Sequence, residues 1–156
     1  MRILILGNSN IFQRKVFPAL CKIKNLKLEL ASKSLIKTNK KIEKTYSSYQ
    51  KALEETSADL VYISLINSLH YSWAIKSLAH NKNLIIDKPM TLNLNQTKKI
   101  MNLASKKKLL ISEAIVFNHH KQFIKMFSML NFKKKMIINT KFHIPKLNKD
   151  NFRNFN

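Results

Sequence analysis

The stretch from residue 59 to residue 91 constrains the fold most, because two hydrophobic periods alternate within it. The segment DLVYISL at residues 59–65 is an almost continuous apolar run, which predicts a buried strand. A polar turn follows, then a helical pattern at residues 69–80 and a second strand at residues 84–87. Continuous apolar strands joined by helices are typical of parallel sheets covered on both faces. This stretch therefore predicts an α/β fold.

The same alternation continues along the rest of the chain. Further strands are expected at residues 3–6, 26–31, 109–112 and 136–143, and further helices at residues 11–24, 49–55, 94–107 and 122–130. Residues 34–44 are polar and rich in lysine, and they show no clear pattern. Because strand–helix–strand crossovers are right-handed, we expect a doubly wound parallel sheet of the Rossmann type.

The size and composition suit a folded domain with a core of its own. The chain has 156 residues, 45% of them hydrophobic. It contains neither an apolar run of roughly 18 residues nor a signal peptide, so we expect no membrane contact. The single cysteine, Cys21, excludes an internal disulfide and is expected to be a small core residue. A reducing, cytoplasmic location is therefore expected.

The net charge of +21 raises the alternative of a non-catalytic basic module that binds nucleic acid. Arginine is the residue best suited to reading guanine or phosphate, yet the chain has only Arg2, Arg14 and Arg153. The lysines are spread along the sequence. We therefore expect compositional bias and no specific nucleic-acid partner, with weak attraction to polyanions from charge alone.

A candidate nucleotide site follows the first expected strand. A dinucleotide fingerprint needs glycine at positions 7, 9 and 12, whereas this chain has Gly7, Ser9 and Phe12. The Ser9 hydroxyl could donate to a phosphate, and the N-terminal end of the next helix, at Asn10 and Ile11, would attract it. The alternative interpretation is an ordinary strand-to-helix turn.

The end of the second expected strand bears on the choice of cofactor. NAD-binding domains place a carboxylate there for the adenosine ribose. This chain has Ser32 and Lys33 instead. A hydroxyl beside a cation suits a 2′-phosphate, which favours NADP over NAD, although Lys33 could equally be a solvated lysine.

Three motifs together resemble the glucose–fructose oxidoreductase / inositol dehydrogenase (Gfo/Idh/MocA) family. They are Gly7 after the first strand, the segment at residues 59–70, and Asp87-Lys88-Pro89. The second is similar to the family's D-x-V-x-I-x-x-P-N-x-x-H turn, with Ile66 in place of proline. The third is similar to its E-K-P motif, with aspartate in place of glutamate. Asn81 stands where glycine commonly ends the preceding helix.

The resemblance covers only the family's N-terminal half. It implies an NAD(P)-binding domain at residues 1–118, and the start of a truncated substrate domain at residues 119–156, with most of the family's C-terminal α+β domain missing. Family members transfer hydride between a nicotinamide cofactor and sugar-type hydroxyls or carbonyls. Such a substrate is expected only if a C-terminal domain is supplied. The exposed strand at residues 136–143 would then favour self-association or a partner chain.

The resemblance also assigns site residues. Lys88 is expected beside the nicotinamide as the catalytic residue, preceded by Asp87 and joined to Pro89 by a cis bond; the alternative is a surface ion pair between Asp87 and Lys88. Leu65, Asn67 and His70 are expected beside the cofactor, although His70 could instead pack beside a helix. Glu113 is expected to contact the nicotinamide ribose or to be a solvated acid. No metal site is expected at His119 and His120.

Overall fold

The computed structural model describes residues 1–33 and 40–131, together with residues 135, 137, 139, 141 and 143. It divides into two compact units, Met1–Val116 and Phe117–Asn156. The expected domains, residues 1–118 for the cofactor and residues 119–156 for the start of a substrate domain, stay a prediction. Within the described ranges, no helix has the length and apolar character needed to span a bilayer.

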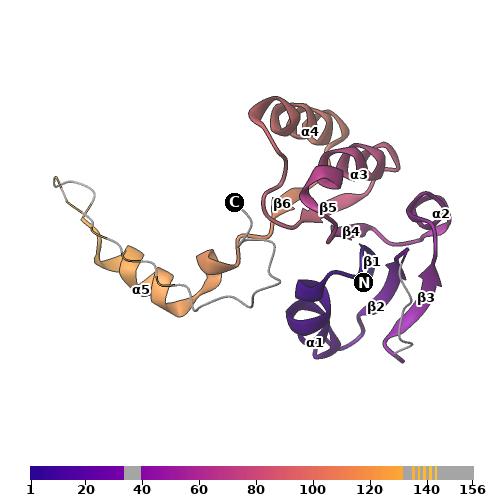
Figure 1. Cartoon of the computed structure of the whole chain (residues 1–156), viewed down its shortest axis with the longest axis horizontal. Helices are drawn as coiled ribbons and strands as arrows, with labels where there is room; N and C mark the ends of the chain where they lie inside the picture. Colours follow the sequence, from indigo (N-terminus) through magenta and orange to yellow (C-terminus); the bar gives the residue numbers. More distant parts are fainter. Residues whose placement is uncertain are drawn as a thin grey trace. The chain divides into compact units, whose positions relative to one another are not determined.

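The first unit is built on one parallel sheet of six strands (Figure 1). The strand order is β3-β2-β1-β4-β5-β6, which is the doubly wound order of two mononucleotide-binding halves. The strands are β1 (Arg2–Leu6), β2 (Lys27–Ala31), β3 (Ile42–Tyr46), β4 (Leu60–Ile63), β5 (Asn83–Ile86) and β6 (Ile111–Glu113). The order in which strands are added changes sides between β1 and β4, which lie next to each other and are parallel. The predicted Rossmann-like fold is confirmed.

Two hydrophobic clusters cover the two faces of this sheet. One lies under α2 (Tyr49–Glu55), α3 (Asn67–Ala79) and α4 (Leu94–Lys107). The other lies under the first helical segment, η1 (Phe12–Val16) and α1 (Phe17–Cys21). Alternate residues of β1 point to opposite clusters: Leu4 and Leu6 belong to the first, and Ile3 and Ile5 to the second. The strands are almost continuously apolar because both of their faces are buried.

Strand β3 was not predicted, because its sequence lacks an apolar run. It forms an edge of the sheet, where β2 is its one partner among the described strands, and it exposes Glu43, Lys44 and Thr45. An edge strand with few buried side chains leaves little hydrophobic signal, and charged residues on it discourage pairing with other chains.

The first helix contains a π-helical segment at Phe12–Val16. The Phe17 N–H donates to the carbonyl oxygen of Phe12, five residues earlier, and Pro18 follows with no N–H to donate. The expectation for Cys21 was wrong, because it lies at the end of α1 with an exposed side chain.

The second unit contains the short helix α5 (Lys121–Met129), preceded by a 3-10 turn, η2 (Val116–His119). Phe123 contacts Phe117 and Phe127, with ring centroids 5.2 and 5.8 Å apart. The strand predicted at residues 136–143 falls on alternating residues that lie outside the described part of the chain, so it stays a prediction.

Candidate functional site

The carboxyl ends of five strands meet at one edge of the sheet. Leu6, at the end of β1, is paired with Ala31 of β2 on one side and with Ile63 of β4 on the other. Ile63 is in turn paired with Ile86 of β5, and Ile86 with Glu113 of β6. The residues that follow these ends include Gly7, Ser32, Ser64 and Asp87. The sheet thus brings together residues from four different loops at the edge where open α/β sheets bind ligands.

Gly7 forms the tight turn after β1 and cannot be replaced without distortion. Its φ is +101°, and its N–H donates to the carbonyl oxygen of Ala31 over 2.9 Å. A Cβ atom at this position would lie 2.3 Å from the carbonyl oxygen of Ser64. The sole glycine of the chain is therefore required by both its backbone angle and the approach of the β4 loop.

Ser9 forms hydrogen bonds within the chain. Its Oγ accepts a hydrogen bond from the Phe12 N–H at 3.1 Å and lies 2.7 Å from the Ser64 Oγ. Since the Ser64 hydroxyl donates to Asp87, the Ser9 proton must be the one between the two serines. In this arrangement the Ser9 proton is occupied and its Oγ caps the first helical turn, while the expected contact with a phosphate stays a prediction.

The first helical turn still presents free donors. Its first backbone hydrogen bond runs from the Gln13 N–H to the Ser9 carbonyl oxygen. The N–H groups of Asn10 and Ile11 precede that bond and have no helical acceptor. Both residues are exposed, so this end of the helix can accept an anion.

Phe12, which stands where the fingerprint has its third glycine, does not obstruct this edge. Its side chain is 2% exposed and packs beneath the helix, with ring centroids 5.7 Å from Phe17 and 6.3 Å from Tyr62. The aromatic ring therefore fills the helix–sheet interface.

Asp87 is held by two hydroxyl groups of β4 and its loop. The Tyr62 hydroxyl donates to Oδ1 over 2.6 Å, and the Ser64 hydroxyl donates to Oδ2 over 2.8 Å. Burial, followed by the hydrogen bond to Asp87, raises the pKa of Tyr62 above its ordinary value. The ion pairs found among the described residues include none between Asp87 and Lys88.

Lys88 has an exposed side chain on a backbone that is fixed on both sides. The Asp87 N–H donates to the Ile63 carbonyl oxygen at 3.0 Å, and the Lys88–Pro89 bond is cis, as expected. The next peptide group is held at both ends: His70 Nδ1 lies 2.8 Å from the Pro89 carbonyl oxygen, and the Met90 N–H donates to Glu113 Oε1 over 2.7 Å.

These contacts revise the expectations for His70 and Glu113. His70 is 0% exposed, and its Nε2 lies 3.0 Å from the Leu65 carbonyl oxygen, so the ring contacts backbone and presents no face to a ligand. His70 belongs to α3, and its ring packs between that helix and the backbone of Leu65 and Pro89, which favours the packing alternative over the cofactor contact. Glu113 is neither a purely solvated acid nor free for a ribose on both oxygens, because Oε1 is bound to Met90.

The other expected residues take separate positions along the same edge. The Ser32 N–H donates to the Tyr46 carbonyl oxygen at 2.9 Å, and Lys33 is exposed, with its ammonium 6.0 Å from the Tyr49 ring centroid. Leu65 is half-buried against the core, and Asn67 begins α3 with an exposed side chain.

Tyr62 and Ser64 were not among the residues that the sequence assigned to the site. A signal was present, because they are two polar residues at alternate positions near the end of the apolar run 60–65. Alternate residues of a strand share one face. A polar pair at the carboxyl end of a buried strand indicates a polar partner on the neighbouring strand, which is Asp87.

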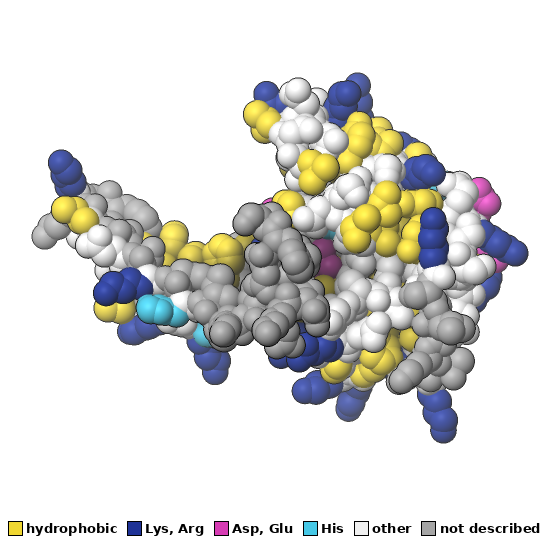
Figure 2. Space-filling view, in the orientation of Figure 1, with side chains coloured by type: hydrophobic (Ala, Val, Ile, Leu, Met, Phe, Trp, Pro, Cys, Tyr) yellow, Lys and Arg dark blue, Asp and Glu magenta, His cyan; other side chains and the backbone are white. Residues whose placement is uncertain are grey.

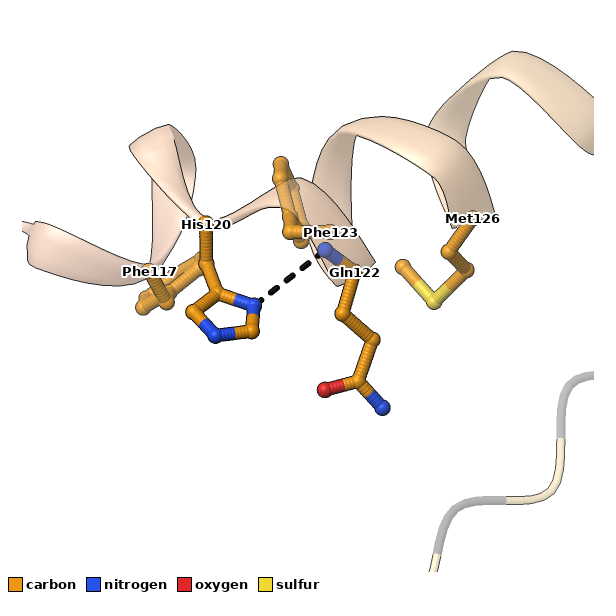
Figure 3. Close-up of a pocket in the computed structure, with 5 residues that line it drawn as sticks. All are labelled: Phe117, His120, Gln122, Phe123 and Met126. Atoms are coloured by element: carbon orange, nitrogen blue, oxygen red, sulfur yellow. Dashed lines mark hydrogen bonds between the residues drawn. The ribbon is translucent and has the colours of Figure 1, made fainter.

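The second unit carries a shallow pocket of about 320 Å³, lined by Phe117, His120, Gln122, Phe123 and Met126 (Figure 3). In it the Gln122 N–H donates to His120 Nδ1 at 3.2 Å. None of its lining residues comes from the sheet edge. Nowhere in the described ranges do three or more His, Cys, Asp or Glu side chains gather as a metal site would require. Lys and Arg side chains are scattered over the visible face and do not form one patch (Figure 2).

Comparison with known proteins gives one family. The model for an "Oxidoreductase family, NAD-binding Rossmann fold", Gfo/Idh/MocA, matches residues 1–115. A dTDP-3,4-didehydro-2,6-dideoxy-alpha-D-glucose 3-reductase of Saccharopolyspora spinosa is 30% identical over 77% of this chain and 38% of its own length. A D-xylose 1-dehydrogenase (NADP(+)) of Haloferax volcanii is 26% identical over 74% of this chain and 37% of its own length.

Solved structures give the same result. The 3-ketoreductase KijD10 of Actinomadura kijaniata, crystallised with NADP and TDP-benzene, superposes with a TM-score of 0.77 at 26% identity. That match covers 83% of this chain and 41% of the reductase. The chain thus spans about two fifths of the length of the relatives that it matches.

Proposed function

Because the chain belongs to the Gfo/Idh/MocA family of NAD-binding oxidoreductases, we propose that residues 1–118 bind NADP in preference to NAD and present Lys88 to the substrate of a hydride transfer. The observation that carries this proposal is the shared carboxyl edge of the sheet. It holds the glycine turn after β1 and, after β5, an exposed lysine on a fixed backbone.

The residues at this edge fit a dinucleotide. The N–H groups of Asn10 and Ile11 would bind the pyrophosphate at the helix end beside Gly7. Farther along the edge, the Asn67 amide would accept or donate hydrogen bonds, and the second oxygen of Glu113 would accept them. When bound, the dinucleotide supplies the hydride acceptor or donor. Ser9, Asp87 and His70 hold the backbone of this edge through their hydrogen bonds to Phe12, Ser64 and Pro89.

Lys88 would act on the substrate oxygen. A positively charged ammonium stabilises the negative charge that develops on a carbonyl oxygen during reduction, and it can hold or release the proton of the product hydroxyl. The backbone on both sides of Lys88 is fixed by hydrogen bonds to β4, His70 and Glu113, which restricts where its side chain can reach.

The preference for NADP rests on the end of β2. Ser32, which is buried, and the exposed Lys33 follow this strand without a carboxylate, and the Lys33 ammonium complements a 2′-phosphate. A relative named as an NADP(+) enzyme and a similar structure crystallised with NADP support the same choice.

The substrate class is a sugar or sugar derivative with a hydroxyl or carbonyl group, as the names of the relatives suggest. Turnover would need substrate-binding groups beyond those of the sheet edge, contributed by further chain or by a partner. We place the reaction in the cytoplasm, on the evidence of the one free cysteine.

Fluorescence titration with NADPH and NADH tests the cofactor proposal. We expect NADPH to bind more tightly than NADH. Lys33→Ala should raise the dissociation constant of NADPH by about fivefold, the factor for one exposed charge-assisted contact, and should leave that of NADH unchanged. Lys76→Ala, an exposed lysine over Trp73 on α3, is the matched control. No fluorescence change with millimolar NADPH would refute the proposal.

A further inference from the structure

A directed chain of hydrogen bonds joins the start of the first helix to the residue before Lys88. The Phe12 N–H donates to the Ser9 Oγ, the Ser9 hydroxyl to the Ser64 Oγ, and the Ser64 hydroxyl to Asp87 Oδ2. Tyr62 donates to the other oxygen, Oδ1. Both carboxylate oxygens of Asp87 therefore accept a hydrogen bond from a hydroxyl group.

The short side chain of aspartate suits this arrangement. Ile63 and Ile86 are paired in the sheet, so Ser64 and Asp87 are the next residues of two adjacent parallel strands. The Asp87 N–H continues this pairing through the Ile63 carbonyl oxygen. The carboxylate is thereby directed across to the neighbouring strand and its loop.

This direction matters for Lys88. Adjacent acidic and basic residues at an exposed turn ordinarily have the freedom to pair, and an ammonium that is paired is less available to another oxygen. Here both oxygens of Asp87 are bound by hydroxyl groups, and Lys88 forms none of the ion pairs found among the described residues.

We propose that Tyr62 and Ser64 are positioning residues that hold the Asp87 carboxylate away from Lys88 and so keep the ammonium available to the substrate. Ser9 extends this support to the glycine turn, so that the phosphate-binding end of the helix and the backbone of Lys88 share one hydrogen-bonded network. The functional meaning rests on the proposed role of Lys88, but the arrangement itself exists in the free chain.

Acylation of lysines in the free chain tests this inference. The chain and its variants Tyr62→Phe and Ser64→Ala are treated with an N-hydroxysuccinimide ester, and labelling is followed peptide by peptide by mass spectrometry. Each variant frees one carboxylate oxygen, which can then pair with Lys88. We expect labelling of Lys88 to slow by about two- to fivefold, the factor for one exposed ion pair, with labelling of Lys76 and Lys99 unchanged.

Matched controls separate positioning from general loosening. Tyr71→Phe and Ser72→Ala remove a hydroxyl from α3 outside the network and should leave Lys88 labelling unchanged. Ser64→Thr keeps the hydroxyl and should preserve the original rate. Adding Asp87→Asn to either slowed variant removes the carboxylate and should restore the original rate of Lys88 labelling.

Unchanged Lys88 labelling in both Tyr62→Phe and Ser64→Ala overturns the inference, as does slowing that persists after Asp87→Asn. These results are independent of nucleotide binding. Failure of the NADPH titration would therefore refute the proposed function alone, and failure of the labelling experiment the positioning role alone.

Discussion

At the scale of single residues, backbone angles explain how this chain departs from its family pattern and still forms the turn. Ile66 stands where the motif usually has proline, and its φ of −68° and ψ of 147° are those of a proline residue. Its side chain is 68% exposed. Isoleucine therefore adopts the required conformation, but without the restriction that proline places on the unfolded chain.

Ile66→Pro should therefore stabilise the domain. We expect the free energy of unfolding to rise by about 0.4–1 kcal/mol, because proline reduces the conformational entropy of the unfolded chain. Urea denaturation followed by circular dichroism measures this change. Ile66→Ala is the control, since it removes the exposed side chain without fixing φ; a proline variant less stable than the alanine variant would contradict the expectation.

At the scale of helices and strands, the chain ends its helices without glycine. Asn25, Asn81 and Lys108 each have a φ of 56°. Asn81 ends α3, with its N–H bound to Leu78 and its Oδ1 accepting from Lys107 Nζ over 2.7 Å. Asparagine there is the expected substitute for glycine, because its short polar side chain tolerates this conformation.

Lys108 ends α4 in the same conformation, which is unfavourable for lysine. Lys108→Gly should raise the free energy of unfolding by about 0.5–1 kcal/mol, because glycine has no Cβ penalty at positive φ. Lys106→Gly, in the last turn of α4, should lower it by a similar amount. Thermal or urea unfolding of both variants distinguishes them, and equal destabilisation would show that the left-handed end is not strained.

At the scale of the whole molecule, the charge is far from balanced. The chain has 29 basic and 8 acidic residues, so repulsion among exposed lysines opposes the compact state. Few acids are available for pairing, and one of them, Glu29, is buried in β2. Its carboxylate is bound by the Arg2 guanidinium at 3.0 Å and by the Tyr46 hydroxyl at 3.1 Å.

The stability of the whole unit should fall in alkaline solution. The folded state keeps the Tyr62 proton where the unfolded chain loses it, because the folded pKa lies above the ordinary value of 10.0. The contribution of Tyr62 is complete below about pH 10 and is lost as pH rises beyond it, at about 1.4 kcal/mol per pH unit for one proton.

Unfolding free energies measured between pH 8 and about pH 11 check this effect. Tyr62→Phe should lower stability at neutral pH, since it removes a hydrogen bond to a charged group, and should show a shallower alkaline decline than the original chain. Tyr71→Phe should keep the original slope. Parallel profiles for the original chain and Tyr62→Phe would refute the assignment.

Local pattern was sufficient for the elements that have a clear period. Helices α2 and α4 have the predicted bounds, residues 49–55 and 94–107. The central strands β4 and β5 begin and end within one or two residues of their predicted bounds. Burial on both faces leaves apolar runs, and amphipathic helices leave a 3.6-residue period. The edge strand β3 leaves neither, because its side chains are mostly exposed.

The sequence by itself determined the order of the strands and helices that have a clear period, the glycine turn and the lysine before Pro89. Tertiary structure alone decided which polar groups meet: Ser9 and Ser64 are 55 residues apart, and Met90 and Glu113 are 23 apart. The hydrophobic pattern records only which side of an element is buried. Hydrogen-bond partners depend on the register between strands, and that register exists only when the parallel sheet has formed.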